Sequence, residues 1–148
     1  MASMRSMTVR GLARAAGLTA EAVRHYVRIG LLSPRRDPDN GYRLFDAPSL
    51  RKARFIRRAR GLGFTLGDIR TIFAHSDRGR SPCPEVRRII QQRIAENRDH
   101  VAELAALLER MEEALERWKS MPDGEPDGEE ICHLIESVPM KEEGEQQR

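Results

Sequence analysis

The sequence has little of what stabilises a secreted or membrane-embedded protein. Only 2 of its 148 residues are cysteine, too few for a disulfide framework, which predicts a reducing cytoplasm. No apolar run reaches transmembrane length, and the N-terminal stretch lacks the apolar core of a secretory signal, so no membrane contact is expected. Aromatic residues make up 5% and charged residues 33%, a composition typical of helices with much exposed surface.

Signatures of catalysis are missing as well. The chain has no nucleophile with a matched base, no glycine-rich phosphate loop and no H-E-x-x-H motif. We therefore expect a binding protein and not an enzyme.

The charge that is present is unevenly distributed. Residues 1–80 carry 17 Lys and Arg against 6 Asp and Glu, whereas residues 81–148 carry 9 against 17. Sixteen of the 17 cations in the first part are arginine, whose planar guanidinium binds phosphate through parallel hydrogen bonds. This half is expected to meet a polyanion, and a merely solvated basic surface is the alternative.

Two short helices joined by a turn are predicted near the N-terminus. Apolar residues follow helical spacing over residues 8–17, and Gly17 ends this first helix. The second helix covers residues 19–28, with Thr19 as its N-cap. Two short helices joined around a glycine form the helix-turn-helix layout.

A small hairpin is predicted next. Asn40-Gly41 favours a two-residue type I′ turn that joins strands over residues 31–35 and 42–45. Two further helices follow the hairpin, and the second begins with a capping box over residues 65–68.

A different pattern begins after Pro84. No proline or glycine interrupts residues 85–121, which predicts a helix of about 37 residues, roughly 55 Å long. Its apolar residues alternate by fours and threes, interrupted only by Asn97: Ile90, Ile94, Val101, Leu104, Leu108, Met111, Leu115 and Trp118. Such a narrow stripe is expected to pack on a partner helix in a homodimer, and packing on its own N-terminal domain is the alternative.

In this order, the motifs closely resemble the MerR family of bacterial transcriptional regulators. The resemblance covers residues 7–120 and depends on T-A-E-A-V-R-H-Y, G-L-L-S-P, N-G-Y-R-L-F and L-G-F-T-L-G-D-I. The fold class that we expect is mainly α, in four parts. These are a winged helix-turn-helix DNA-binding domain (1–80), a long antiparallel coiled-coil dimerisation helix (81–121), an effector loop with a short helix (122–139) and a disordered tail (140–148).

Charge and resemblance together predict binding to double-stranded promoter DNA. The second helix of the helix-turn-helix is expected to enter the major groove, with Arg24 on a base or a nearby phosphate. The resemblance carries Tyr42 and Arg43 of the wing onto the DNA backbone. A core position for Tyr26 is weighed nearly evenly with DNA contact. The other predicted contacts are Thr19, His25, Tyr26, Arg28, Arg51, Lys52 and Arg54.

The resemblance also implies a mechanism. The dimer would lie between the two elements of a promoter whose spacer is too long. On binding an effector it would bend and untwist the DNA so that RNA polymerase, an indirect partner, can use both elements. A smooth bend costs on the order of 1–6 kcal/mol, so many phosphate contacts are needed to hold it.

The two cysteines flank the long helix. Cys83 lies at its start, and Cys132 with His133 lies beyond its end. In an antiparallel dimer, Cys83 of one subunit would meet the Cys132-His133 pair of the other. Two thiolates and an imidazole suit Zn²⁺, Cd²⁺, Hg²⁺ or Pb²⁺, and the resemblance links a cysteine at position 83 with sensors of divalent ions.

The sequence departs from the metal-responsive proteins that it resembles, which carry another cysteine where the helix runs into the loop. An oxygen ligand could come from an acidic residue of this loop: Asp123, Asp127, Glu129 or Glu130. The alternatives are a redox-sensing disulfide between Cys83 and Cys132, an organic effector, or a buried structural Cys132. A coiled-coil adaptor without specific DNA binding is the remaining class.

Overall fold

The computed structural model describes residues 6–140 and divides into two compact units, Met1–Ala95 and Glu96–Arg148. The boundary falls inside the longest helix, whereas the sequence pattern predicted boundaries after residues 80 and 121. The predicted disordered tail, apart from its first residue, lies outside the described residues.

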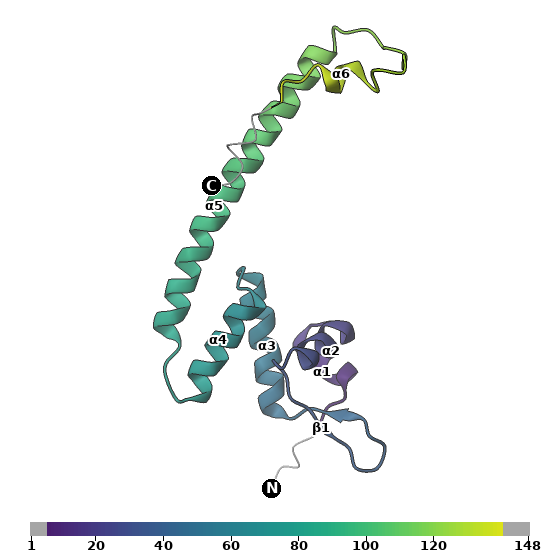
Figure 1. Cartoon of the computed structure of the whole chain (residues 1–148). Helices are drawn as coiled ribbons and strands as arrows, with labels where there is room; N and C mark the ends of the chain where they lie inside the picture. Colours follow the sequence, from purple (N-terminus) through teal and green to yellow (C-terminus); the bar gives the residue numbers. More distant parts are fainter. Residues whose placement is uncertain (1–5, 141–148) are drawn as a thin grey trace. The chain divides into compact units, whose positions relative to one another are not determined.

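The helix-turn-helix forms as predicted in the first unit. Helices α1 (Val9–Ala16) and α2 (Ala20–Arg28) pack together beside the hairpin (Figure 1). Gly17 adopts a φ of 71°, a left-handed conformation that residues with a Cβ rarely adopt, and so ends α1. The Thr19 hydroxyl accepts a hydrogen bond from the Ala22 backbone N–H at 3.0 Å and caps α2.

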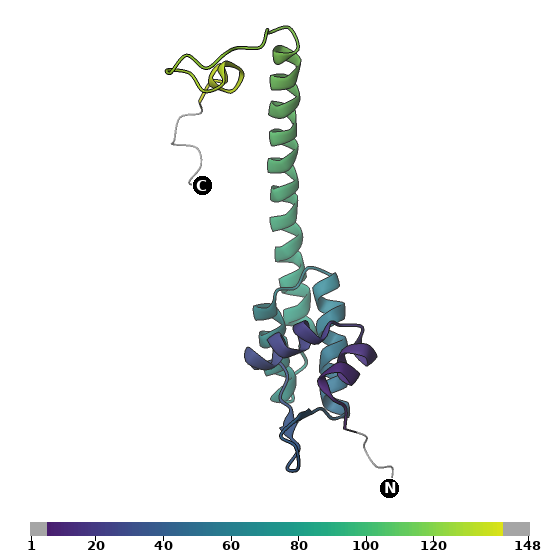
Figure 2. The ribbon, with the colours of Figure 1, turned by 90° about the vertical axis from the view of Figure 1, so that its right-hand side faces the viewer.

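The wing is a short antiparallel hairpin of β1 (Arg35–Arg36) and β2 (Arg43–Leu44), which extends away from the helices of its unit (Figure 2). The first strand begins later than predicted, and both strands are shorter. Residues 38–41 form a loop that is closed by the hydrogen bond from Asp37 N–H to the Tyr42 carbonyl, at 2.8 Å.

The predicted type I′ turn is therefore wrong. That turn needs a positive φ at two successive residues, and among the described residues only glycines have one. Gly41 has a φ of 73°, but Asn40 does not. The Asn40 side-chain oxygen instead accepts a hydrogen bond from Tyr42 N–H at 2.9 Å, which stabilises a wider loop.

Helices α3 (Ala47–Gly61) and α4 (Leu66–Asp77) complete the globular part of the first unit. Asp46 caps α3 by accepting from Ser49 N–H at 2.9 Å. The capping box of α4 forms as predicted, with the Thr65 hydroxyl and the Asp68 carboxylate each accepting from the other's backbone N–H.

Helix α5 (Cys83–Trp118) contains 36 residues and lies within the predicted segment 81–121. It begins slightly before the predicted stretch 85–121 and ends slightly before residue 121. Its first turns belong to the core of the first unit, where Ile89 is only 3% exposed. The largest fully buried side chains of that core are Leu12, Val23, Leu32, Phe45, Ile56, Ile69 and Ile72.

The second unit contains the rest of α5, an acidic loop and the short helix α6 (His133–Glu136). Among the residues of this unit that the structure describes, only Ala114 is buried. The unit therefore leaves most of its apolar side chains in contact with solvent. No helix within residues 6–140 is long and apolar enough to cross a bilayer.

Candidate DNA interface and effector residues

Helix α2 separates its core residues from its exposed cations. Val23 is 0% exposed and Tyr26 is 9% exposed, and both belong to the core of the first unit. Arg24 and Arg28 are exposed, and His25 is half-buried with its ring 5.9 Å from that of Tyr26. Contact of Tyr26 with DNA stays a prediction, and the structure gives its ring a packing role.

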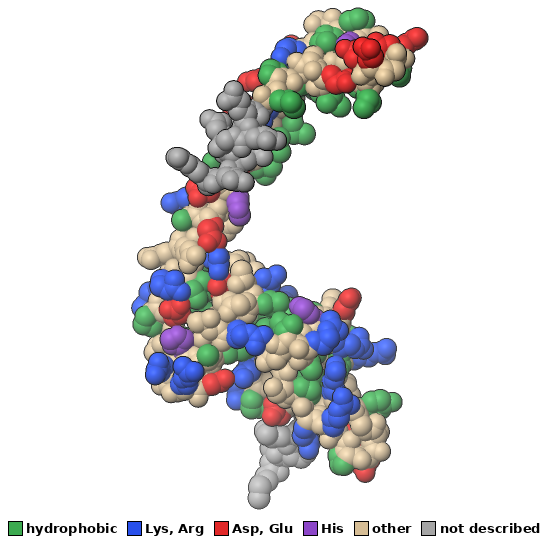
Figure 3. Space-filling model, in the orientation of Figure 1, with side chains coloured by type: hydrophobic (Ala, Val, Ile, Leu, Met, Phe, Trp, Pro, Cys, Tyr) green, Lys and Arg blue, Asp and Glu red, His purple; other side chains and the backbone are tan. Residues whose placement is uncertain are grey.

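Arginine also faces arginine on the wing. Arg36 and Arg43 are direct cross-strand partners. Two like charges directly opposite each other destabilise a hairpin unless an anion lies near them. One nitrogen of Arg36 donates to the Gly41 carbonyl at 3.0 Å. Tyr42, beside them, is 67% exposed. Lys and Arg side chains also gather over α1 and α2 on the face shown in Figure 3.

The predicted contacts on α3 are partly used within the chain. Lys52 lies 3.9 Å from the Asp77 carboxylate and 5.2 Å from the centre of the Phe73 ring. Arg54 donates a long hydrogen bond, 3.4 Å, to the Ala15 carbonyl near the end of α1. Arg51 is exposed.

An ion pair that sequence reasoning did not predict joins α4 to α5. Arg93 donates to both carboxylate oxygens of Asp68, at 2.7 and 2.9 Å, and these side chains are 22% and 11% exposed. The hydrogen bond from Arg93 lowers the pKa of Asp68 to about 2. The residues are 25 positions apart in two separate helices, so no local pattern reports the pair. The capping box at 65–68 was the only available signal.

The two cysteines lie in different units. Cys83 is the first residue of α5 and is exposed, whereas Cys132 is the N-cap of α6 and is half-buried. Cys132 N–H donates to a Glu136 carboxylate oxygen at 2.9 Å, and His133 Nε2 lies 2.9 Å from the Pro122 carbonyl. His133 therefore holds the loop against α6.

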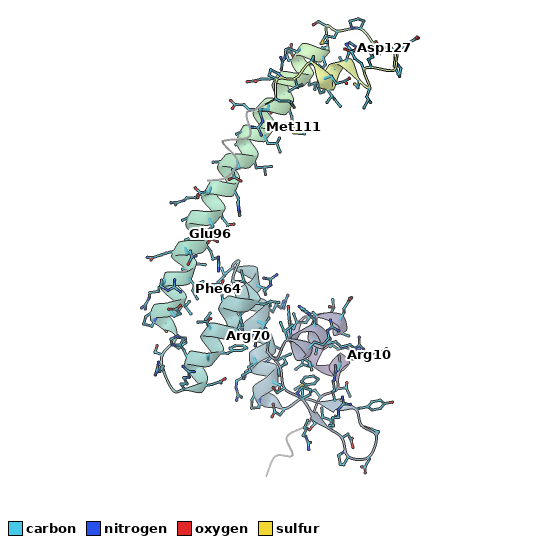
Figure 4. The ribbon with its side chains drawn as sticks, in the orientation of Figure 1. Arg10, Phe64, Arg70, Glu96, Met111 and Asp127 are labelled. Carbon is cyan, nitrogen blue, oxygen red and sulfur yellow. The ribbon has the colours of Figure 1, made fainter. Side chains whose placement is uncertain are left out.

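An open hollow of about 700 Å³ lies between the acidic loop and α6. It is lined by Asp123 and Glu130 as well as by Cys132 and His133. Asp127, labelled in Figure 4, accepts from the backbone N–H groups of Glu129 and Glu130, both at 2.9 Å, and these bonds lower the pKa of its carboxyl. That carboxylate is thus used to hold the turn.

A single chain does not assemble a complete metal site within residues 6–140. No three His, Cys, Asp or Glu side chains there lie close enough together to hold an ion. The predicted donors, which are the thiols of Cys83 and Cys132 and the imidazole of His133, suit a borderline or soft cation chemically. Each chain can therefore supply part of a ligand set.

The helix-turn-helix, the wing and the long helix together define a winged DNA-binding protein. Two family models match the chain: "MerR HTH family regulatory protein" over residues 7–76, and "MerR, DNA binding" over residues 50–114. The transcriptional regulator HmrR of Rhizobium leguminosarum bv. viciae is 35% identical, and the match covers 72% of this chain and 81% of that protein.

Two other proteins match over more of the chain. A probable heavy metal-dependent transcriptional regulator of Haemophilus influenzae is 28% identical, over 89% of this chain and 98% of its own length. The structure of PbrR691 from Ralstonia metallidurans CH34, in complex with lead(II), is 29% identical with a TM-score of 0.68. That match covers 88% of this chain and 98% of PbrR691.

The chain therefore belongs to the MerR family. It is a DNA-binding transcriptional regulator, as the resemblance of its motifs predicted. Proteins of this family are regulators and not enzymes, and the same holds for this chain. The coiled-coil adaptor without DNA binding is thereby set aside.

Proposed function

We propose that the chain works as a homodimer that binds promoter DNA, and that a divalent metal ion shared between the subunits controls it. Helix α2 would enter the major groove with Arg24, and the wing would bind the DNA backbone through Tyr42 and Arg43. A regulator of this kind acts where the chromosome is, which agrees with the cytoplasm predicted from the two cysteines.

The observation that carries the dimer is the apolar stripe on α5. Its exposed fractions are 68% for Val101, 55% for Leu108, 60% for Met111 and 56% for Leu115. These residues repeat at the spacing of a coiled-coil seam, and no element of the same unit buries them. Burying them against a second copy removes this apolar surface from water.

Two-fold symmetry then determines the kind of DNA that is bound. A symmetric dimer presents two recognition helices related by the same axis, so a palindromic operator fits it. We propose that the dimer holds promoter DNA in two forms and that the effector favours the bent, untwisted one. An effector can do so only by binding one form more tightly than the other.

For the effector site we propose Cys83 of one subunit together with Cys132 and His133 of the other. The chemistry of these donors supports it, as do the lead(II) complex of PbrR691 and the probable heavy-metal dependence of the Haemophilus influenzae regulator. The candidates are Zn²⁺, Cd²⁺, Hg²⁺ and Pb²⁺. A bound cation would place positive charge beside the two thiolates. Each subunit supplies only some of the ligands of a site, so the cation would join the two subunits.

Mixed dimers test whether the site is shared. Cys83→Ser and Cys132→Ser homodimers should each lose tight, saturable binding of Zn²⁺, Cd²⁺ and Pb²⁺ in a competitive titration. A dimer that combines one chain of each variant regains one intact site. An equal mixture of the two variants should therefore recover roughly a quarter of the wild-type sites, because half of its dimers are mixed. His75→Ala is the matched control and should bind as the wild type does.

Every other outcome would contradict a metal site shared between the subunits. Binding that survives in either homodimer means that its cysteine is not needed, and no recovery in the mixture means that both cysteines come from one chain. If metal binding is weak throughout but DNA binding changes on oxidation and survives a chelator, the signal is a disulfide.

A further inference from the structure

Helix α4 contacts both the recognition helix and the long helix through side chains only two positions apart. Arg70, labelled on α4 in Figure 4, donates a hydrogen bond to the carbonyl of Ile29, the C-cap of α2. Asp68 binds Arg93 of α5 through both carboxylate oxygens. One turn of α4 thus connects α2, the helix proposed to read DNA, with α5, the helix that continues into the dimerisation stripe.

The contact with α5 is the more constrained of the two. A bidentate guanidinium–carboxylate pair has a fixed planar geometry, unlike a pair formed by a flexible lysine. A second hydrogen bond also restrains Asp68, because the same carboxylate accepts from Thr65 N–H at 2.9 Å in the capping box. Ile89 packs in the core one turn before Arg93. Rotation of α5 about its axis would therefore break the ion pair.

We propose that Asp68 and Arg93 are positioning residues that determine which half-site spacing the dimer accepts. This proposal rests on the proposed dimer through α5. Ile90, the first residue of the stripe, packs against the core of the first unit, so the exposed part of the stripe begins at Ile94, directly after Arg93. The direction in which α5 leaves the first unit would therefore set the distance between two copies of α2. Neither Asp68 nor Arg93 needs to contact DNA for this role.

The test is binding to a series of palindromic DNA fragments whose half-site separation differs by single base pairs, measured by fluorescence anisotropy. The starting fragment is selected from random DNA with the wild-type protein. The wild type should prefer one spacing. In Arg93→Gln the ratio of affinities for the best and neighbouring spacings should fall by roughly threefold to thirtyfold. Arg93→Lys keeps the charge but loses the planar fork, so its ratio of affinities should lie between those of the wild type and Arg93→Gln.

Salt dependence separates positioning from phosphate contact. A lost phosphate contact lowers the slope of log K against log salt by about 1, whereas a positioning residue leaves that slope unchanged. Arg88→Gln is the matched control, since Arg88 lies on the same helix and pairs with Glu85 at the surface. It should keep the wild-type spacing preference.

The outcomes are distinct for the two proposals. A wild-type spacing ratio in both folded Arg93 variants would overturn the positioning role, as would a lowered salt slope. The Lys variant keeps the test decisive if Gln prevents folding, which circular dichroism reports. Failure of the wild type to select any two-fold site would instead refute the proposed function.

Discussion

The Asp68 carboxylate makes two kinds of contact, since it completes the capping box of α4 and binds Arg93 of α5. Its pKa of about 2 lies below the usual 3.8, and the Arg93 hydrogen bond is the largest cause. A carboxyl whose pKa is depressed by folding contributes stability above its unfolded pKa and loses it as the pH falls through the folded value. This contribution, about 2 kcal/mol, is thus complete above about pH 4 and disappears between about pH 4 and pH 2.

This linkage predicts a pH-dependent effect of Arg93→Gln. At pH 7 the substitution leaves the mostly buried Asp68 carboxylate without its cation and should lower the free energy of unfolding by about 2–4 kcal/mol per chain. Near pH 2, close to the folded pKa of Asp68, about half of the wild-type carboxyl is protonated and its bond to Arg93 is weakened, so the loss should shrink. Urea unfolding at both pH values and one protein concentration measures it. Equal losses at both would contradict the account, and Arg88→Gln should cause no measurable loss at either.

At the scale of single elements, local rules predicted the helix ends well. The caps at Thr19 and Thr65 depend on hydrogen bonds within three residues, which a sequence displays directly. The turn of the wing was wrong because an Asn-Gly pair is compatible with more than one loop. The choice here depends on the side-chain oxygens of Asp37 and Asn40, each of which accepts a hydrogen bond from the backbone N–H two residues later.

The wing loop gives a prediction about Gly41. An added Cβ at Gly41 would meet no atom within 4 Å, so Gly41→Ala costs only the strain of a positive φ, about 1–2 kcal/mol. We expect the loop to shift and DNA affinity to fall, because the wing carries Tyr42 and Arg43. Gly61→Ala, which also adds a Cβ in open space but without a positive φ, is the control. Filter binding at fixed salt compares them, and equal affinities would show that the wing loop does not matter.

At the scale of the whole molecule, the seam on α5 could be predicted from its heptad spacing because periodicity is a local property. The position of Cys83 at the start of α5, and of Cys132 beyond its end, was also predicted. The Asp68–Arg93 and Arg70–Ile29 contacts could not be, since they join segments 25 and 41 residues apart. Long-range pairs of this kind depend on how helices pack and leave no sequence spacing to read.

The seam predicts that one polar substitution separates the subunits. Leu108 is 55% exposed in a single chain, and a symmetric dimer would bury one Leu108 from each of its two subunits. Leu108→Glu should therefore weaken dimerisation by about 3 kcal/mol or more, roughly a hundredfold in the dissociation constant. Sedimentation equilibrium measures it. Glu109→Ala, one position outside the seam, should leave the constant unchanged, and a dimer unaffected by both changes would move the interface elsewhere.

The most direct measurement of the central claim is selection of binding sites from a random DNA pool by the wild-type protein, alongside Arg24→Ala. The account predicts that the wild type enriches a two-fold symmetric sequence, with half-sites separated by about one or two turns of the double helix. Arg24→Ala should relax the preference within each half-site or weaken binding throughout. Enrichment of an asymmetric sequence, or of none, would contradict a symmetric dimer that reads DNA through α2.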